Sequence, residues 1–288
     1  MKSEEESSNA LFVSALEALI ATKREKPPLM RSIHHFTCSG GTIISKCIAA
    51  MPNVCLLSEV DPLSAMGFDS ARPHFAPTDV IRHLRFSPRC IEDEVVVNCY
   101  LAQIKSLAID LNKRGMSLVL RDHSHSNYCV ERAADSRVSH IEILRRHFDS
   151  CAIITVRDPV ESYGSLLGNR WETYAPRGFD EYCRRYLDFL DEHRTLPVYK
   201  YEDFTADPES ILMQMCSNLA LDYNDVWQST VSIFSLTGDS GRASDEVSHR
   251  TRKPVSDDLA RQIEVSRNWE KLSDRLGYSS SLSENRSR

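Results

Sequence analysis

The chain has 288 residues with 35 basic and 41 acidic side chains, so its formal net charge is −6. Hydrophobic residues make up 41% and charged residues 26%, a composition typical of a globular protein that can bury a sizeable core. The acidic balance argues against a nucleic-acid polymer as the main partner, because proteins that bind such polymers carry an extended basic surface.

The nine cysteines include no CxxC pair, so no structural zinc site is indicated and no metal is expected. Their odd number and their places in apolar runs are typical of buried thiols in a reducing compartment. The apolar run that begins at Leu11 is short and contains Ser14 and Glu17, so neither a signal peptide nor a membrane span is predicted. We therefore expect a cytoplasmic protein.

In chain order, the predicted strands alternate with predicted helices. Strands are predicted over 33–37, 53–57, 118–120, 151–156 and 197–201. Helices are predicted over 10–23, from 42 to about 51, and over 79–86, 91–114, 159–169, 179–193, from 207, and over 224–235, 256–267 and 269–276. This order predicts a single-domain three-layer α/β/α fold with a mostly parallel sheet. The domain should span 9–278, between a disordered N-terminus (1–8) and a disordered tail (279–288).

A glycine turn follows the first predicted strand. The segment Cys38-Ser39-Gly40-Gly41-Thr42 lies between that strand and a helix. Adjacent glycines let the backbone approach a ligand closely, and the free N–H groups of a first helical turn favour an anion. We interpret this loop as a site for the 5′-phosphate end of a nucleotide. The alternative is that the two glycines only form a turn.

Two further polar clusters also begin where an apolar strand ends: Arg121-Asp122-His123 and Arg157-Asp158. In parallel sheets, ligands bind at the carboxyl ends of the strands, so the three clusters should meet at one edge. Arg157 at a strand end and Ser165 on the following helix could both reach one phosphate, through a bidentate guanidinium and a hydroxyl donor. The alternative is that Arg157 pairs with a carboxylate structurally.

At this point a family resemblance becomes specific. VRDPVESYGS resembles the 3′-phosphate-binding segment of the sulfotransferases that use 3′-phosphoadenosine 5′-phosphosulfate, and Arg157, Pro159 and Ser165 match its pattern. TCSGGT resembles the family's 5′-phosphosulfate loop, matching at Ser39 and Thr42 as well as at Gly40.

Two later segments extend the resemblance, so that it covers about 31–278. KYEDFTADPESILMQMCSNLAL resembles the family's strand–YED–helix unit, which implies Tyr201 at the cofactor site. TGDSGR resembles the C-terminal loop of bacterial members, which implies Arg242 as a ligand of the 3′-phosphate, with Arg250 and Lys253 near it. The alternative for this basic run is a solvated surface.

The resemblance implies a P-loop NTPase-like fold and a bacterial-like sulfotransferase. Such an enzyme moves a sulfuryl group from 3′-phosphoadenosine 5′-phosphosulfate to a hydroxyl or amine of a small molecule or saccharide. Two rival functions stay open: an ATP-dependent small-molecule kinase on the same fold, and a nucleotide-binding protein without turnover. The absence of a Gly-Lys-Ser/Thr ending weakens the kinase interpretation.

The loop departs from the family pattern at two positions. Cys38 stands where the family has a Lys or Arg, and Gly41 replaces the first Thr of a Thr-Thr pair. A cation there would stabilise charge on the bridging oxygen as the sulfuryl group leaves. Lys46, one helical turn after Thr42, could substitute for it.

The acceptor hydroxyl needs a base, and His123 is the first candidate because it follows a strand at the predicted site edge. The family places a catalytic His in this region, which supports His123 by resemblance. Glu59, after the second predicted strand, is the alternative base. His125 should face the same side as His123 if the backbone stays extended, and Asp122 could orient His123.

Two histidines, a tryptophan and a proline-rich segment near the predicted site could have a structural or a functional role. Of His34 and His35, one is expected to face the sheet interior. Trp171 is expected to pack, or else to line the acceptor pocket. Residues 62–78, with several prolines, are expected to form an irregular substrate loop.

Overall fold

The structure is a computed structural model that describes residues 27–64, 66, 75–89, 91–130, 138–238, 247 and 254–279. The helix predicted over 10–23 and the predicted disordered N-terminus lie outside the described residues. So do residues 280–288 of the predicted tail, much of the predicted substrate loop, and Arg242, Arg250 and Lys253.

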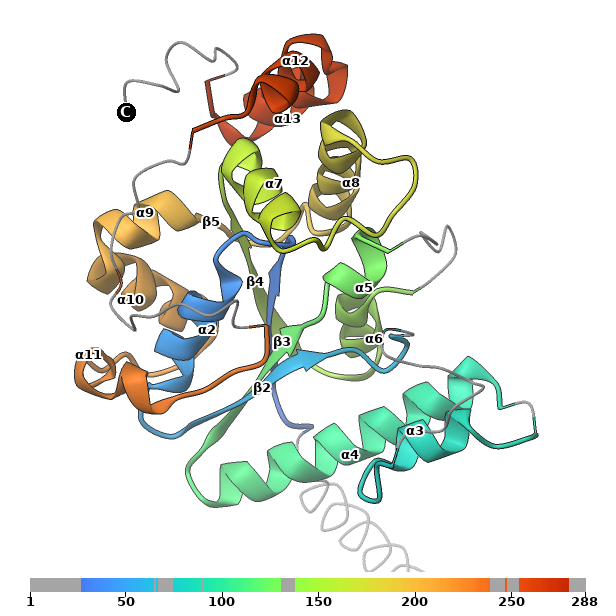
Figure 1. Cartoon of the computed structure of the whole chain (residues 1–288). Coiled ribbons are helices and arrows are strands. Elements are labelled where there is room, and N and C mark those ends of the chain that lie inside the picture. The colour runs from blue at the N-terminus through green and yellow to red at the C-terminus, as the bar shows by residue number, and fades with distance from the viewer. Residues whose placement is uncertain are drawn as a thin grey trace, which may run out of the picture.

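Five parallel strands form one sheet in the order β2-β3-β1-β4-β5, with β1 at its centre (Figure 1). The strands are β1 (Met30–His35), β2 (Val54–Val60), β3 (Ser117–Asp122), β4 (Ser150–Val156) and β5 (Val198–Lys200). The predicted parallel α/β architecture is confirmed. From β1 the chain first moves to β2 and β3 on one side, and then crosses to β4 and β5 on the other side. Ligands of open parallel sheets bind where the strand order reverses in this way.

Helices cover both faces of the sheet (Figure 1). Side chains of α2, α9, α10 and α11 pack on one face, and those of α4, α6 and α8 pack on the other. The helices are α2 (Gly41–Ala49), α3 (Val80–Arg85), α4 (Asp93–Lys113), α5 (His125–Tyr128), α6 (His140–His147), α7 (Pro159–Gly168), α8 (Phe179–Glu192), α9 (Tyr201–Ala206), α10 (Pro208–Asn218), α11 (Trp227–Thr230), the 3₁₀ turn η1 (Val231–Ile233), α12 (Asp257–Val265) and α13 (Arg267–Leu276).

Side-chain caps fix several helix starts where the sequence predicts them. The Asp158 carboxylate accepts hydrogen bonds from the backbone N–H groups of Val160 and Glu161, and Pro159 occupies the first turn of α7. Asp207 caps α10 in the same way, ahead of Pro208. An acceptor at the cap and a proline whose missing N–H costs nothing both favour a start at these positions. The α7 cap therefore also fixes where Arg157 leaves the sheet.

The structure corrects the sequence prediction at three elements. The last strand is shorter than predicted, because the chain turns helical at Tyr201 and forms α9. Helices α5 and α6 are not predicted by the sequence. The extended backbone of β3 does not continue through His125, because His125 begins α5.

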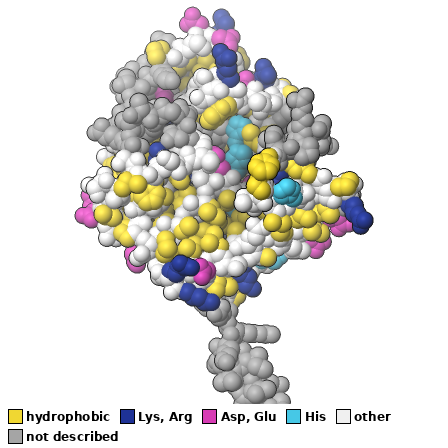
Figure 2. Space-filling view, turned by 60° about the horizontal axis from the view of Figure 1, so that its bottom comes forward, with side chains coloured by type: hydrophobic (Ala, Val, Ile, Leu, Met, Phe, Trp, Pro, Cys, Tyr) yellow, Lys and Arg dark blue, Asp and Glu magenta, His cyan; other side chains and the backbone are white. Residues whose placement is uncertain are grey.

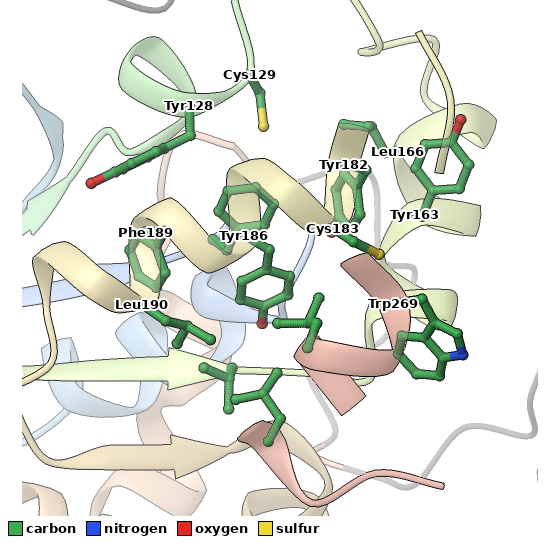
Figure 3. Packing of buried hydrophobic residues seen from close by; sticks show 14 of the residues in the cluster. Tyr128, Cys129, Tyr163, Leu166, Tyr182, Cys183, Tyr186, Phe189, Leu190 and Trp269 are labelled. Carbon is green, nitrogen blue, oxygen red and sulfur yellow. The ribbon is translucent and has the colours of Figure 1, made fainter. Parts of the chain in front are cut away.

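The core on the α8 side is rich in aromatic rings (Figure 3). Tyr182, Tyr186 and Phe189 project from α8, and Trp269 of α13 packs against the same cluster. The ring of Phe36 stacks on Tyr186 at 4.3 Å between centroids. Phe36 lies just after β1, so this packing fixes the backbone that leads into the glycine loop.

In the described ranges, no helix is long and apolar enough to cross a membrane. The cysteines of these ranges are free thiols. Nor do the His, Cys, Asp and Glu side chains of these ranges gather into a group of three or more that could hold a metal ion.

Candidate functional site

A cavity of about 300 Å³ opens at the carboxyl ends of β1, β2, β3 and β4. It brings together nearly all of the described residues that the sequence predicts for the site. The predicted residues that line it are Cys38, Ser39, Gly40, Gly41, Thr42, Lys46, Glu59, His123, Arg157 and Ser165. The three polar clusters therefore converge at one sheet edge.

Each glycine of the loop backs directly onto an aromatic ring. A Cβ added at Gly41 would lie 2.3 Å from Cγ of His35, and one added at Gly40 would lie 2.2 Å from Cδ2 of Tyr201. Gly40 also has a φ of 82°, in the left-handed region. The rings leave no room for a side chain at either position, so the loop requires glycine at both. The loop and the first residues of α2 line the cavity.

Arg121 supplies a cation to this loop, and the sequence prediction missed it. The side chain is 3% exposed and comes from the end of β3. Its Nη2 donates a hydrogen bond to Thr42 Oγ1 at 3.0 Å, and Nη1 donates to the Ser58 hydroxyl at 2.9 Å. Its Nε and Nη2 lie 3.3 and 3.0 Å from Nε2 of His35. A signal was present: the cation that is missing at Cys38 stands at another strand end of the same sheet.

His35 links Gly41 to Arg121. Its ring fills the space that a Cβ at Gly41 would need, and its Nε2 accepts from the guanidinium. Burial and the adjacent Arg121 charge hold the pKa of His35 well below its usual range, so the imidazole is neutral. Glycine at position 41, where the family pattern has Thr, therefore leaves room for the His35 ring, and His35 positions Arg121.

Cys38 carries no charge at the cavity. Its φ of 62° places it in the left-handed region, where a residue with a Cβ is strained. Burial raises the pKa of its thiol to about 12, although a hydrogen bond with Asn169 and the charge of Arg157 act in the opposite direction. Lys46, which is 7% exposed, also lines the cavity. Arg121 and Lys46 are thus the two cations at the loop among the residues described.

The Arg157 half of the cavity is built by one helix. The Arg157 Nη2 lies 3.1 Å from the Glu161 carboxylate, and the Ser165 hydroxyl donates to the Glu161 carbonyl at 2.9 Å. The structural alternative for Arg157 is thus present, with Glu161 as the carboxylate. Arg157 still lines the cavity, and its guanidinium lies 4.9 Å from the ring centroid of Tyr201. Tyr201 itself does not line the cavity. Its ring packs against both Gly40 and the Arg157 guanidinium.

The segment at Thr237 and Gly238 crosses the loop half. Arg121 Nη1 donates to the Thr237 carbonyl at 2.8 Å, and Thr42 Oγ1 donates to the Gly238 carbonyl at 3.1 Å. A Cβ at Gly238 would lie 2.2 Å from Oε1 of Glu59. Thr237 and Gly238, the first two residues of TGDSGR, therefore lie against the glycine-loop side of the cavity. The rest of this segment, with Arg242, lies outside the described residues.

Glu59 sits at an irregular point of β2. Its φ is 57°, and the register of β2 against β3 shifts between Leu57 and Val60. This bulge turns the carboxylate toward the cavity, where Oε1 lies 3.6 Å from Nη2 of Arg121. Glu59 is thus a counter-charge to Arg121 in this state.

Asp122 does not orient His123, and that expectation is wrong. Its carboxylate points to the opposite face of the sheet, where it lies 3.2 Å from Nδ1 of His34 and 3.3 Å from Nδ1 of His140. The Ser124 hydroxyl donates to it at 2.9 Å. These contacts outweigh the cost of burial and hold the pKa of Asp122 well below its usual range. His34 is accordingly the interior histidine, and the cluster anchors the end of β3.

His123 and His125 both line the cavity, with nearly parallel rings 6.3 Å apart. Trp171 lines the cavity as well and meets His125 edge-on. The face that carries α3 and α4 shows histidine side chains reaching the surface among hydrophobic ones (Figure 2). This side of the cavity carries fewer charged side chains than the loop side.

Solved structures with a similar fold identify the fold of this chain. No family model and no curated protein matches the chain. Among solved structures, the sulfotransferase domain from the curacin biosynthetic pathway matches over 88% of this chain and 99% of its own, with a TM-score of 0.50 and 13% identity. The chain has a sulfotransferase fold. The sulfotransferase domain of the Synechococcus PCC 7002 olefin synthase matches over 89% of this chain and 97% of its own, at 16% identity and a TM-score of 0.48.

Proposed function

We propose that the protein is a sulfotransferase that moves a sulfuryl group from 3′-phosphoadenosine 5′-phosphosulfate to a hydroxyl or amine of a small molecule or saccharide. One observation carries the proposal: a single cavity is lined both by the glycine loop and by Arg157 and Ser165. Two anion sites in one cavity suit a nucleotide with phosphates at both its 5′ and 3′ positions. ATP has no 3′-phosphate, so the kinase alternative leaves the second site unexplained.

In this proposal the loop from Ser39 to Thr42 holds the 5′-phosphosulfate through backbone N–H groups. Arg157 and Ser165 hold the 3′-phosphate, with Glu161 giving up the guanidinium to it. Arg242 is proposed as a further ligand of that phosphate, on the resemblance of its segment alone. Tyr201 supports both anion sites through its ring.

Arg121 takes over the role of the cation that Cys38 cannot supply. Its guanidinium is held at the loop by His35 and Thr42, so it is positioned before any substrate arrives. Preorganised charge of this kind stabilises a leaving oxyanion without reorganisation during the reaction. Lys46 is the second cation at the loop. Transfer would be in line, with positioning and charge stabilisation as the main sources of rate, as in phosphoryl transfer.

The base is proposed to come from the acceptor side of the cavity. His123 lines that side as the sequence predicts, and Glu59 is the alternative. The position of Glu59, 3.6 Å from Arg121 and directly beneath Gly238, favours an imidazole instead. A cytoplasmic location remains a prediction of the sequence.

Thermal denaturation tests this function. A ligand that binds only the folded chain raises its melting temperature by mass action. We expect 3′-phosphoadenosine 5′-phosphate to stabilise the protein without magnesium, and wild-type protein to transfer sulfate to a member of a panel of phenols, alcohols, amines and saccharides. Stabilisation by ATP and magnesium alone would sink the proposal. Binding without transfer to any acceptor would favour the non-catalytic alternative.

A further inference from the structure

The ring of His125 is held at one of its two nitrogens. His125 begins α5, and its Nδ1 lies 3.0 Å from the Thr37 hydroxyl oxygen. The Thr37 hydroxyl donates its own hydrogen to Sγ of Cys129 at 3.2 Å. The hydroxyl oxygen is then left to accept from Nδ1–H, because a hydroxyl has only one hydrogen to give. We therefore assign to His125 the tautomer that carries its hydrogen on Nδ1 and leaves Nε2 with a free lone pair.

The other side of the ring faces the cavity. His125 lines it, and Trp171 holds the ring edge-on at 6.3 Å between centroids and 82° between planes. No group in the described part of the chain makes a hydrogen bond with Nε2. Thr37 is the residue directly before Cys38, so the ring is tied to the start of the glycine loop. An unprotonated nitrogen is thereby presented beside the proposed sulfuryl site.

His123 lacks this support. Its ring stacks on that of His125 at 17°, but within the described ranges no hydrogen bond fixes either of its nitrogens. A working base is generally oriented by a third group on its far side, and here only His125 meets that requirement. The sequence pattern that favours His123 cannot show which imidazole is held.

The geometry points to a reassignment of the base. We propose that His125, oriented by Thr37, takes the proton of the acceptor, an inference that rests on the proposed function. The acceptor oxygen forms a bond to sulfur while the bond from sulfur to the 5′-phosphate oxygen breaks and leaves its electron pair on that phosphate. The acceptor proton passes to Nε2 of His125.

The electrostatic surroundings explain how the half-buried His125 imidazole can accept this proton. Burial and the neighbouring His123 lower the pKa of His125 to about 4, while Glu59 raises it. His125 is therefore neutral and ready to accept a proton above that pH. Negative charge within a few ångströms favours an imidazolium, so a bound phosphosulfate should strengthen the base at the moment it is needed.

The pH dependence of sulfuryl transfer should show the titration of His125. The groups facing His125 are His123 after β3, Glu59 on β2, the Thr37–Cys129 pair and the neutral Trp171. The base is lost as pH falls through its pKa, so the acid limb of kcat/KM for the donor, which reports the free protein, should lie near pH 4. The acid limb of kcat should lie higher, because the donor is then bound.

Four variants test the assignment, each measured for single-turnover transfer and for its dissociation constant with 3′-phosphoadenosine 5′-phosphate. His125→Ala should slow transfer by about 10²- to 10⁴-fold, the usual worth of a general base, with the dissociation constant changed less than about threefold. Thr37→Val should also slow transfer, and Thr37→Ser should restore it, because only the hydroxyl is needed. His123→Ala should slow transfer clearly less than His125→Ala does, because His125 is the residue that accepts the proton.

Loss of transfer in His123→Ala with retention in His125→Ala would overturn the assignment. So would a His125→Ala protein that has lost nucleotide binding, since that result indicates a structural role. Nitrogen-15 shifts of the imidazoles test the tautomer without any turnover: wild type should show His125 protonated at Nδ1 and Thr37→Val a mixture, whereas a wild-type Nε2–H tautomer refutes the proposal. A wild type that binds 3′-phosphoadenosine 5′-phosphate yet transfers nothing counts against the proposed function alone.

Discussion

The two ends of the cavity are built in opposite ways. At the Arg157 end, Arg157, Glu161 and Ser165 lie within nine residues, and their contacts with one another are local to the start of α7 and its first turns. At the loop end, Arg121 comes from β3 and reaches Thr42 across β1, with His35 between them. The local end follows from spacing along one helix, whereas the loop end exists only once the sheet has formed. The difference teaches that a cation absent from a loop can reach it from a neighbouring strand, as Arg121 does here.

The largest effect should come from Arg121→Met, which removes the replacement cation. We expect kcat to fall by about 10²- to 10³-fold, the usual cost of losing one preorganised charge-stabilising donor. Nucleotide affinity should change much less, because the loop's N–H groups remain. Rapid-quench measurement of sulfuryl transfer checks this. Arg121→Lys should recover part of the rate, and an unchanged rate in Arg121→Met would show that the loop end needs no cation from β3.

Arg157→Met should act on binding instead. Hydrogen bonds to a charged group contribute about 1.5–3 kcal/mol, so the dissociation constant for 3′-phosphoadenosine 5′-phosphate should rise by about 10- to 100-fold. Affinity for adenosine 5′-phosphate should stay the same, since that ligand has no 3′-phosphate. Isothermal titration calorimetry with both ligands gives the comparison. An equal loss for the two ligands would mean that the ends of the cavity are not specialised.

Gly41→Ala tests the packing that brings Arg121 to the loop. The new Cβ would meet the His35 ring at 2.3 Å, and such overpacking costs about 1–3 kcal/mol. We expect a lower free energy of unfolding in urea titrations, together with loss of activity. Adding His35→Ser should restore stability but not activity, because the support of Arg121 is gone. Gly164→Ala is the matched control: its Cβ would meet nothing within 4 Å, so no loss of stability should follow.

The smallest effect should come from Glu161→Gln. Glu161 holds Arg157 at 3.1 Å in this state, and a 3′-phosphate would have to compete with it. Removing the carboxylate charge frees the guanidinium and lessens repulsion, so nucleotide should bind a few-fold more tightly. Half-buried pairs of this kind contribute little, about 1 kcal/mol or less. Weaker binding in the titration would show that Glu161 positions Arg157 for the phosphate.

Much of the fold is readable from the sequence because its signals are local. Unbroken apolar runs such as 151–156 identify buried parallel strands, and Asp–Pro pairs identify helix starts. The strand predicted over 197–201 ends early because α9 begins at Tyr201, whose ring packs beneath Gly40 and Arg157. That is a tertiary requirement, and no pattern along the chain reveals it.

The candidate site is predictable in its membership but not in its roles. Strand ends that follow apolar runs bring most of the predicted residues to one cavity. The direction of each side chain is not available from the sequence, because Arg121 and Asp122 alternate across β3 and one residue of register decides which faces the loop. For the same reason the sequence pairs Asp122 with His123, whereas the sheet pairs it with His34.

One comparison of affinities tests the central claim, a single cavity with two anion sites, most directly. The dissociation constants of 3′-phosphoadenosine 5′-phosphate and adenosine 5′-phosphate are measured for wild type and for Arg157→Met, without magnesium. The account predicts a preference of at least about tenfold for the doubly phosphorylated nucleotide in wild type, and none in the variant. Equal affinity of wild type for the two nucleotides would contradict it.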